Sequence, residues 1–155
     1  MAVPSQNQYF NPPDHATASP AYSHISRIPI SPTSTLVTFA GQVGVRTDGP
    51  SQGINSDTVP STLSEQCDVA FANVDKCLAA AGARKEDIVH IRHYVVDLLR
   101  GGKGQDPARQ ESYLKWMGEL RPPSTLIGVQ ALAAEQLLYE IDVVCVVKHE
   151  VQYQA

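Results

Sequence analysis

The sequence predicts an α+β fold, a two-layer sandwich in which a mixed β-sheet carries two helices on one face. Residues 63–81 and 107–120 place apolar side chains at helical spacing, whereas several other segments have the composition of strands. The resulting order is strand, strand, helix, strand, helix, strand, strand, which is typical of a sheet with helices on one side. The 155 residues suffice for one domain with a core.

The composition changes after the first 21 residues. Residues 1–21 contain four prolines, several Ser, Asn and Gln residues and few large apolar ones. Such a segment buries too little apolar surface to order itself, so it predicts a flexible N-terminal arm. Residues 22–148 form the predicted domain, and residues 149–155 form a polar C-terminal tail.

The first two strands of the domain are predicted at residues 22–30 and 36–40. The second strand ends at Gly41 and Gln42, and apolar residues continue briefly beyond it. Residues 47–60 are rich in Gly, Pro, Ser, Asn and Asp, which predicts a loop.

Each predicted helix has recognisable ends and one packed side. Ser61 or Thr62 can cap the first helix, with Glu65 completing a capping box after Thr62, and Gly82 ends it. Its apolar stripe consists of Leu63, Cys67, Ala70, Val74, Cys77 or Leu78, and Ala81. The second helix begins at Pro107 and packs through Tyr113, Trp116 and Met117.

A long strand is predicted over residues 87–98. Strict alternation would place Ile88, His90, Arg92, Tyr94 and Val96 on one face and Val89, Ile91, His93 and Val95 on the other. Because His90 and His93 then face opposite ways, they cannot bind one metal ion together. We predict no metal site and no cofactor.

The last two strands contain the best single candidate for chemistry. Pro122 and Pro123 fix the start of the first of them, because proline is excluded from helix interiors and central strands. In the second, which runs over residues 137–147, Glu140 lies within an apolar run. A carboxylate placed there must be paired, hydrated or protonated. The alternative is a glutamate at a strand edge that faces water.

Composition excludes several classes of function. The net charge is −4 and no basic run occurs, which argues against nucleic-acid binding. No apolar run approaches the ~20 residues that span a bilayer, and the first 26 residues lack Lys and Arg, which argues against a targeting peptide. The three cysteines, Cys67, Cys77 and Cys145, are predicted to be buried free thiols. A cytoplasmic protein is therefore predicted.

The sheet face without helices needs a cover, which predicts an oligomer.

Several segments of the chain resemble one family in their order and spacing. They are Pro20–Ser23, Val37–Gln42, Asn73–Gly82, Asp87–Val89, Asp97-Leu98, Tyr113 and Tyr139–Ile141. Over residues 20–148 they resemble the Rid (YjgF-type) family of imine and enamine deaminases. The resemblance implies a chorismate-mutase-like fold and a homotrimer with small-molecule pockets between its subunits.

The resemblance also implies roles for individual residues. Tyr22 would orient a water or a substrate carbonyl, and Glu140 would position the attacking water. The family motif Pro-Ala-Arg-Ser becomes Pro-Pro-Ser-Thr here, so Ser124 stands where the family's Arg binds the substrate carboxylate. Loss of that Arg should weaken carboxylate binding by ~30-fold or more. Gln110 stands where the family often has Asn, and His24 where it often has Gln.

The remaining candidates for substrate binding have simple structural alternatives. Ser124 and Thr125 could donate hydrogen bonds to a neutral ligand or be ordinary strand residues. Gln42, beside Gly41, could contact a ligand or hold the end of the strand. Arg92 could replace the missing Arg or form a surface or intersubunit ion pair.

Two functions remain open from the sequence. The first is an enzyme that acts on an imine, enamine or enol-type intermediate, other than the usual 2-iminoacids, in secondary metabolism or a similar setting. Tyr22 and Glu140 favour it. The second is a non-catalytic, trimeric small-molecule-binding or regulatory protein, which the missing Arg favours.

Overall fold

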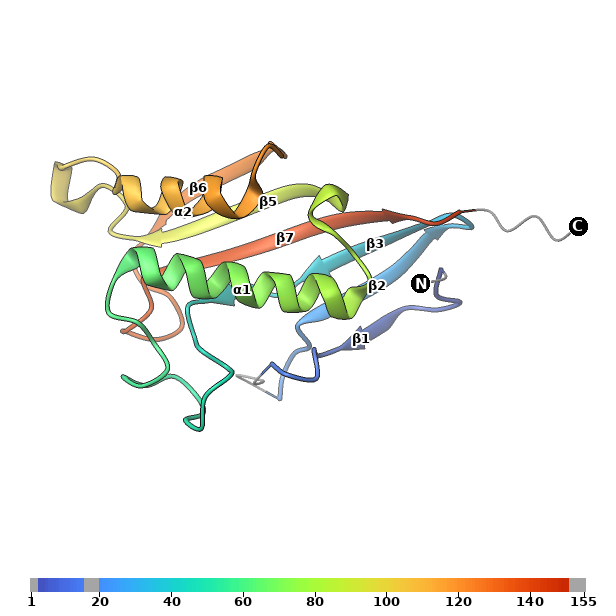
Figure 1. Ribbon diagram of the computed structural model, residues 1–155, viewed down its shortest axis with the longest axis horizontal. Coiled ribbons are helices and arrows are strands. Elements are labelled where there is room, and N and C mark those ends of the chain that lie inside the picture. Colours follow the sequence, from blue (N-terminus) through green and yellow to red (C-terminus); the bar gives the residue numbers. More distant parts are fainter. Residues whose placement is uncertain (1–2, 16–19, 151–155) are drawn as a thin grey trace, which may run out of the picture.

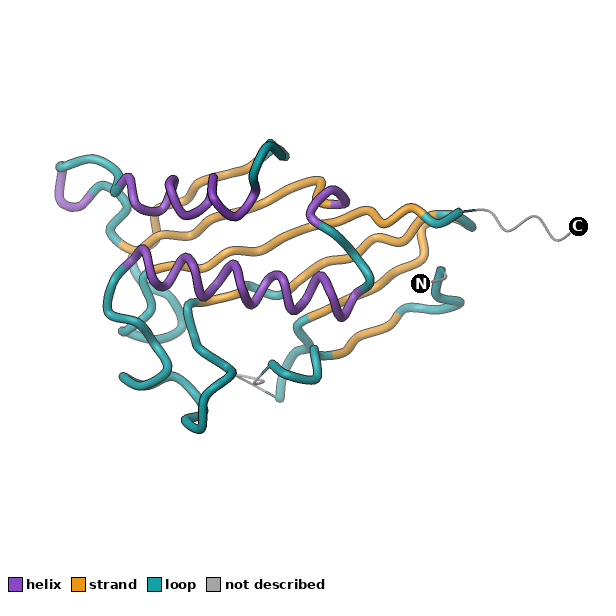
Figure 2. The backbone as a smooth tube through the Cα atoms, viewed as in Figure 1, coloured by secondary structure: helices purple, strands orange, loops and turns teal. Residues whose placement is uncertain are grey.

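The computed structural model describes residues 3–15 and 20–150. It consists of a single mixed β-sheet with two helices packed on one face, as the sequence predicts (Figures 1 and 2). Helix α1 spans Leu63–Ala81 and helix α2 spans Pro107–Met117, and they lie side by side over the sheet. Two short 3-10 helices, Lys85–Asp87 and Arg100–Gly102, precede and follow the strand Ile88–Val96 along the chain.

The sheet has the strand order β1-β2-β3-β7-β5-β6, and the short strand β4 pairs with the start of β7. Only β5 and β6 run parallel, because α2 crosses over between them. The strands are β1 (Gln8–Phe10), β2 (Ile25–Ser31), β3 (Ser34–Phe39), β4 (Gln42–Val43), β5 (Ile88–Val96), β6 (Ser124–Val129) and β7 (Tyr139–Lys148).

The predicted ends of α1 are confirmed. The Thr62 side chain accepts a hydrogen bond from the Glu65 amide and donates one to the Glu65 carboxylate. Gly82 ends the helix in the left-handed region, at φ 67°, where a residue without Cβ is favoured. The predicted stripe packs on the sheet, and Phe71 of the same helix stacks on Trp116 of α2 at a centroid distance of 4.7 Å.

Residues 8–10 correct the expectation of an unstructured arm. They form β1, which pairs with the edge of β2, and Phe10 packs against the core. Backbone pairing at an open sheet edge supplies hydrogen bonds that the composition of the segment does not reveal. Residues 1–2 and 16–19 of the expected arm, and 151–155 of the expected tail, lie outside the described residues. The boundaries between the arm, the domain of residues 22–148 and the tail therefore stay predictions.

A bulge in β5 corrects the predicted alternation at its start. The register against β7 shifts between Ile88 and His90, so Ile88 joins the buried face while Val89 is 44% exposed. From His90 onward the alternation holds. Ile91, His93 and Val95 are buried under the helices, and the residues between them lie on the other face.

The sheet face away from the helices carries a row of half-buried aliphatic side chains. Ile28 on β2 lies opposite Leu36 on β3, which lies opposite Val146 on β7. We call this side of the sheet, the one away from the helices, the open face. The row crosses three neighbouring strands, so its side chains form one contiguous apolar surface.

Two buried amide side chains of α1 fix the end of β4 and the segment that leads into β7. The Gln66 amide donates to the carbonyls of Pro60 and Gln136 and accepts from the backbone N–H of Leu138. Asn73 donates to the carbonyls of Val43 and Val45. Backbone groups that would lack partners are thereby satisfied, and the end of β4 and the start of β7 are held against the helix.

A buried His–Tyr pair lies between the sheet and the helices. His93 is 1% exposed, and its Nδ1 lies 2.6 Å from the hydroxyl of the fully buried Tyr139. Burial, together with the charge of Arg109, lowers the pKa of His93 from 6.5 to about 4. Burial raises the pKa of Tyr139 well above its ordinary value, so its phenol stays protonated and donates to the neutral imidazole.

We expect the protein to lose stability as the pH falls from 6.5 to 4. In that window the unfolded chain protonates His93 and the folded protein does not, which costs about 3 kcal/mol in total. Urea unfolding of the wild type and of His93→Gln across this range measures the effect, since the variant should have the flatter profile. Parallel profiles would show that His93 titrates normally in the folded state.

Candidate functional site

The Glu140 carboxylate is half-buried on the open face near the start of β7. Its register neighbours are Tyr94 on β5 and Val43 on β4. Gly41 leaves the space that the carboxylate fills, because a Cβ on Gly41 would overlap Oε1 and lie 2.6 Å from Cδ of Glu140. Among residues 3–15 and 20–150, no hydrogen bond or ion pair satisfies this carboxylate.

Burial is the main cause that raises the pKa of Glu140, and the negative charge of Asp142 raises it further. The neighbouring Tyr22 is 43% exposed, and burial followed by the Glu140 charge raises the pKa of its phenol. A carboxyl group with a raised pKa can accept and return a proton near neutral pH, while the phenol remains a donor.

A second polar group on the open face surrounds Asp142. The Arg92 Nε donates to both carboxylate oxygens of Asp142, at 2.9 and 3.0 Å, and the Tyr94 hydroxyl donates to one of them at 2.9 Å. Arg92 therefore forms an ion pair with Asp142, which is the alternative that the sequence left open for this residue. Sequence reasoning missed Tyr94 and Asp142, although their alternation with buried neighbours places both on the face of Glu140.

Gln42 holds the short link between β3 and β4 that contains Gly41. Its side chain is 1% exposed and donates to the Ala40 carbonyl at 2.8 Å and to Nδ1 of His24 at 3.1 Å. Its carbonyl oxygen lies 2.7 Å from Nε2 of His15 and accepts from it. The ring of His24 lies 4.1 Å from that of His15 and 5.6 Å from that of Tyr22.

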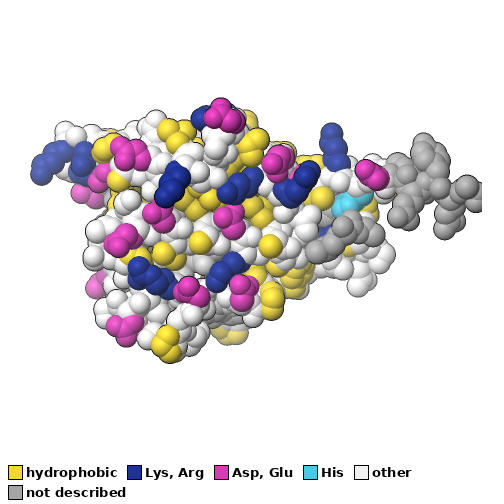
Figure 3. All heavy atoms as spheres, in the orientation of Figure 1, with side chains coloured by type: hydrophobic (Ala, Val, Ile, Leu, Met, Phe, Trp, Pro, Cys, Tyr) yellow, Lys and Arg dark blue, Asp and Glu magenta, His cyan; other side chains and the backbone are white. Residues whose placement is uncertain are grey.

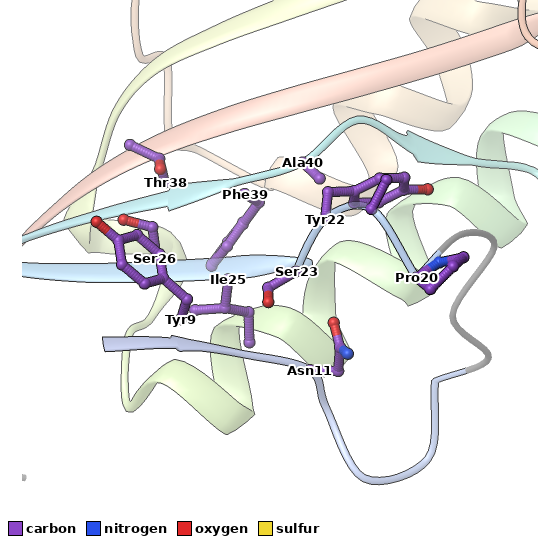
Figure 4. A pocket seen from close by; sticks show the side chains of 11 residues that line it. Tyr9, Asn11, Pro20, Tyr22, Ser23, Ile25, Ser26, Thr38, Phe39 and Ala40 are labelled. Carbon is purple, nitrogen blue, oxygen red and sulfur yellow. The ribbon is translucent and has the colours of Figure 1, made fainter. Parts of the chain in front are cut away.

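Two hollows meet at Tyr22, which lines both. A cavity of about 430 Å³ is also lined by His24, Gly41, Gln42 and the loop that follows β4. A groove of about 590 Å³ is lined by β1, the segment before β2, the start of β2 and the end of β3, with Tyr9 and Tyr22 toward its opposite ends (Figure 4). Tyr22 therefore links both hollows to the neighbourhood of Glu140.

The structure brings some of the expected site residues together and separates others. Tyr22, Gly41 and Gln42 gather near Glu140, and Arg92 and Thr125 lie opposite each other further along the open face. Ser124 instead pairs with the buried Ile91, on the helix-covered face. Gln110 is exposed on α2. Within one chain, Ser124 and Gln110 are therefore remote from Glu140.

The described residues contain no group of three or more His, Cys, Asp or Glu side chains that could hold a metal ion. In this part of the chain, no helix combines the length and apolar character needed to cross a membrane. The three cysteines are buried and free, and burial raises the pKa of each thiol to about 12.

The fold and sequence match known proteins. A family profile described as Endoribonuclease L-PSP matches residues 14–147. A Mycobacterium tuberculosis member of the YjgF/YER057c/UK114 family is 25% identical, with a TM-score of 0.65 and coverage of 90% of this chain and 98% of that one. Comparison with curated proteins gives no match.

Two further solved structures share the fold at lower identity. A Yersinia pestis member of the Rid family, YyfA, is 19% identical with a TM-score of 0.70, and the match covers 90% of this chain and 98% of that one. The yeast protein YEO7 is 15% identical with a TM-score of 0.72, over 94% of this chain and 100% of that one.

Proposed function

The chain belongs to the Endoribonuclease L-PSP family, which includes the Rid (YjgF) enamine and imine deaminases, and on that premise we propose that it is an enzyme acting on an imine, enamine or enol-type small molecule. The reaction is hydrolytic deamination or a related proton transfer or addition. Glu140 moves the proton, and Tyr22 orients the water or the substrate.

The state of Glu140 carries this proposal. Its carboxylate is half-buried, has a raised pKa and lacks a partner in the described part of the chain. In imine hydrolysis it takes a proton from water as the oxygen attacks the C=N carbon and passes that proton to the nitrogen, which gives a neutral carbinolamine. Glu140 then takes the proton of the carbinolamine hydroxyl and gives it to the amine nitrogen as the C–N bond breaks, so that a carbonyl compound and ammonia leave. The Tyr22 phenol stays protonated and donates a hydrogen bond.

The substrate class follows from the missing carboxylate clamp. Ser124 replaces the family's Arg, and the Arg92 guanidinium is already bound to Asp142. A neutral imine or enamine, larger than the usual 2-iminoacids and of a kind made in secondary metabolism, fits this chemistry better than a small imino acid.

An activity panel tests the proposed function. Neutral imines and small 2-iminoacids are supplied in parallel, and carbonyl product and ammonia are measured. We expect faster turnover of the neutral substrates. Because Ser124 lies away from Glu140 within one chain, Ser124→Arg should raise turnover of the imino acids by supplying a guanidinium from a neighbouring subunit. Equal or better turnover of imino acids by the wild type would contradict the proposed substrate class.

We expect the protein to be a homotrimer with its sites between subunits, because the apolar row Ile28–Leu36–Val146 needs a cover. Light scattering at micromolar concentration should give about 50 kDa, three times the 16.8 kDa of the chain. Leu36→Glu should dissociate the assembly, whereas Leu114→Glu, at an exposed position on α2, should leave it intact. A monomeric wild type would contradict the trimer.

A non-catalytic small-molecule binder is the second candidate, favoured by the replacement of the Arg with Ser124. It predicts ligand binding between subunits with no reaction for any substrate of the panel.

The name of the family profile suggests a third activity, on RNA. The net charge of −4 and the interspersed charges on the helix side offer no continuous basic surface for phosphates there (Figure 3).

A further inference from the structure

A separate small cavity lies under the N-terminal ends of the two helices. Its volume is about 210 Å³, and its apolar wall is formed by Leu63 of α1, Val95 of β5, Leu98 and Leu138. Val95 points to the helix-covered face, whereas Glu140 lies on the open face. The cavity is therefore separate from the candidate site around Glu140.

Arg109, in the first turn of α2, completes the cavity wall. The residue is 9% exposed, and its Nε is buried without a hydrogen-bond partner. Within residues 3–15 and 20–150, no acidic side chain comes within ion-pair distance of its guanidinium. A buried cation without a counter-charge destabilises a fold, and it does so more at a helix N-terminus, where the helix dipole is positive.

Two carboxylates also border the cavity, and both have other partners. Asp106 caps α2 by accepting from the Ala108 amide at 3.0 Å, and it lies 3.8 Å from Nη1 of Arg100. Asp97 accepts from the Gly101 amide at 3.2 Å. Arg109 thus combines an unsatisfied positive charge with apolar surroundings, an arrangement suited to a ligand that has one negative group and a hydrocarbon body.

We propose that this cavity binds a small organic monocarboxylate. Its carboxylate pairs with the Arg109 guanidinium, and its short aliphatic or aromatic body packs against Leu63, Val95 and the two neighbouring leucines. The volume admits a molecule of the size of 3-methylbutanoate or benzoate. The site does not depend on the reaction proposed for Glu140.

Calorimetric titration with 3-methylbutanoate and benzoate tests the site, and the neutral amides of both acids serve as probes without charge. We expect the acids to bind the wild type at least tenfold more tightly than the amides. Arg109→Gln should lose at least tenfold in affinity for the acids. Lys115→Gln, at an exposed cation on the same helix, and Glu140→Gln should bind them like the wild type.

Equal binding of acid and amide, full affinity in Arg109→Gln, or no binding of either acid at about 10 mM would overturn the proposal. Urea unfolding supplies a second readout. Without ligand, Arg109→Met should unfold at a higher urea concentration than the wild type, and benzoate should raise the midpoint of the wild type only. A less stable Arg109→Met would identify Arg109 as a structural residue and would also overturn the proposal.

Discussion

Replacing Glu140 by Gln should lower turnover of the true substrate by ~10²–10⁴-fold. The amide has the shape and the hydrogen-bonding capacity of the carboxyl group, but it cannot accept and return a proton. The side chain has no partner among the described residues, so the substitution breaks no hydrogen bond or ion pair within this part of the chain. Steady-state kinetics on a substrate identified by the imine panel measures the loss.

Glu111→Gln is the matched control, because Glu111 is an exposed glutamate on α2, in the other layer. It should leave turnover unchanged. Stability separates loss of chemistry from loss of fold. An unpaired carboxylate with a raised pKa costs free energy above that pKa, so Glu140→Gln should unfold at the same or a higher urea concentration. Full activity in Glu140→Gln would show that the chemistry lies elsewhere.

The pH profile gives a signature of Glu140 that a structural role would not. As a base, Glu140 must be deprotonated, so activity should rise with pH through a pKa above the ordinary 4.5 of a glutamate. Asp142→Asn removes the like charge and should move this acid limb to lower pH. Glu140→Gln should lack the limb altogether.

The elements that local chemistry determines could be predicted from the sequence. The cap at Thr62, the Gly82 terminus and the packed side of each helix depend on residues within one or two turns. Strand β1 and the bulge after Ile88 could not be predicted, because both depend on pairing with a distant strand. The same limit hid the distance between Ser124 and Glu140, since the face on which a strand residue lies follows from the register.

The candidate site likewise contains residues that could be predicted from the sequence and residues that could not. Glu140 could be proposed because a single carboxylate in an apolar run is a local signal. The partners of Asp142 and the space that Gly41 leaves arise where β4 and β5 pair with β7. The spacing of residues along the chain does not indicate this pairing. Arg109 gave no signal either, because an arginine in a first helical turn resembles a solvated residue until its burial is known.

Gly41→Ala should lower turnover by about 10²-fold while the protein stays folded. The added Cβ would overlap Oε1 of Glu140 and lie 2.6 Å from its Cδ, so the carboxylate must move aside by more than an ångström. A displacement of about 1 Å from the reacting geometry costs on the order of 10²-fold in rate. The clashing group is the end of a flexible side chain, so the backbone need not shift. Turnover and urea unfolding, measured together, check both statements.

Gly49→Ala is the matched control, because a Cβ there meets no atom within 4 Å. It should have the turnover of the wild type. The double variant Gly41→Ala, Glu140→Gln decides whether the glycine acts through the carboxylate. If it does, the double variant is no slower than Glu140→Gln alone, because the displaced group no longer carries a proton. Losses that multiply would mean that Gly41 contacts the substrate directly, and full activity in Gly41→Ala would mean that the position of the Glu140 carboxylate does not limit the reaction.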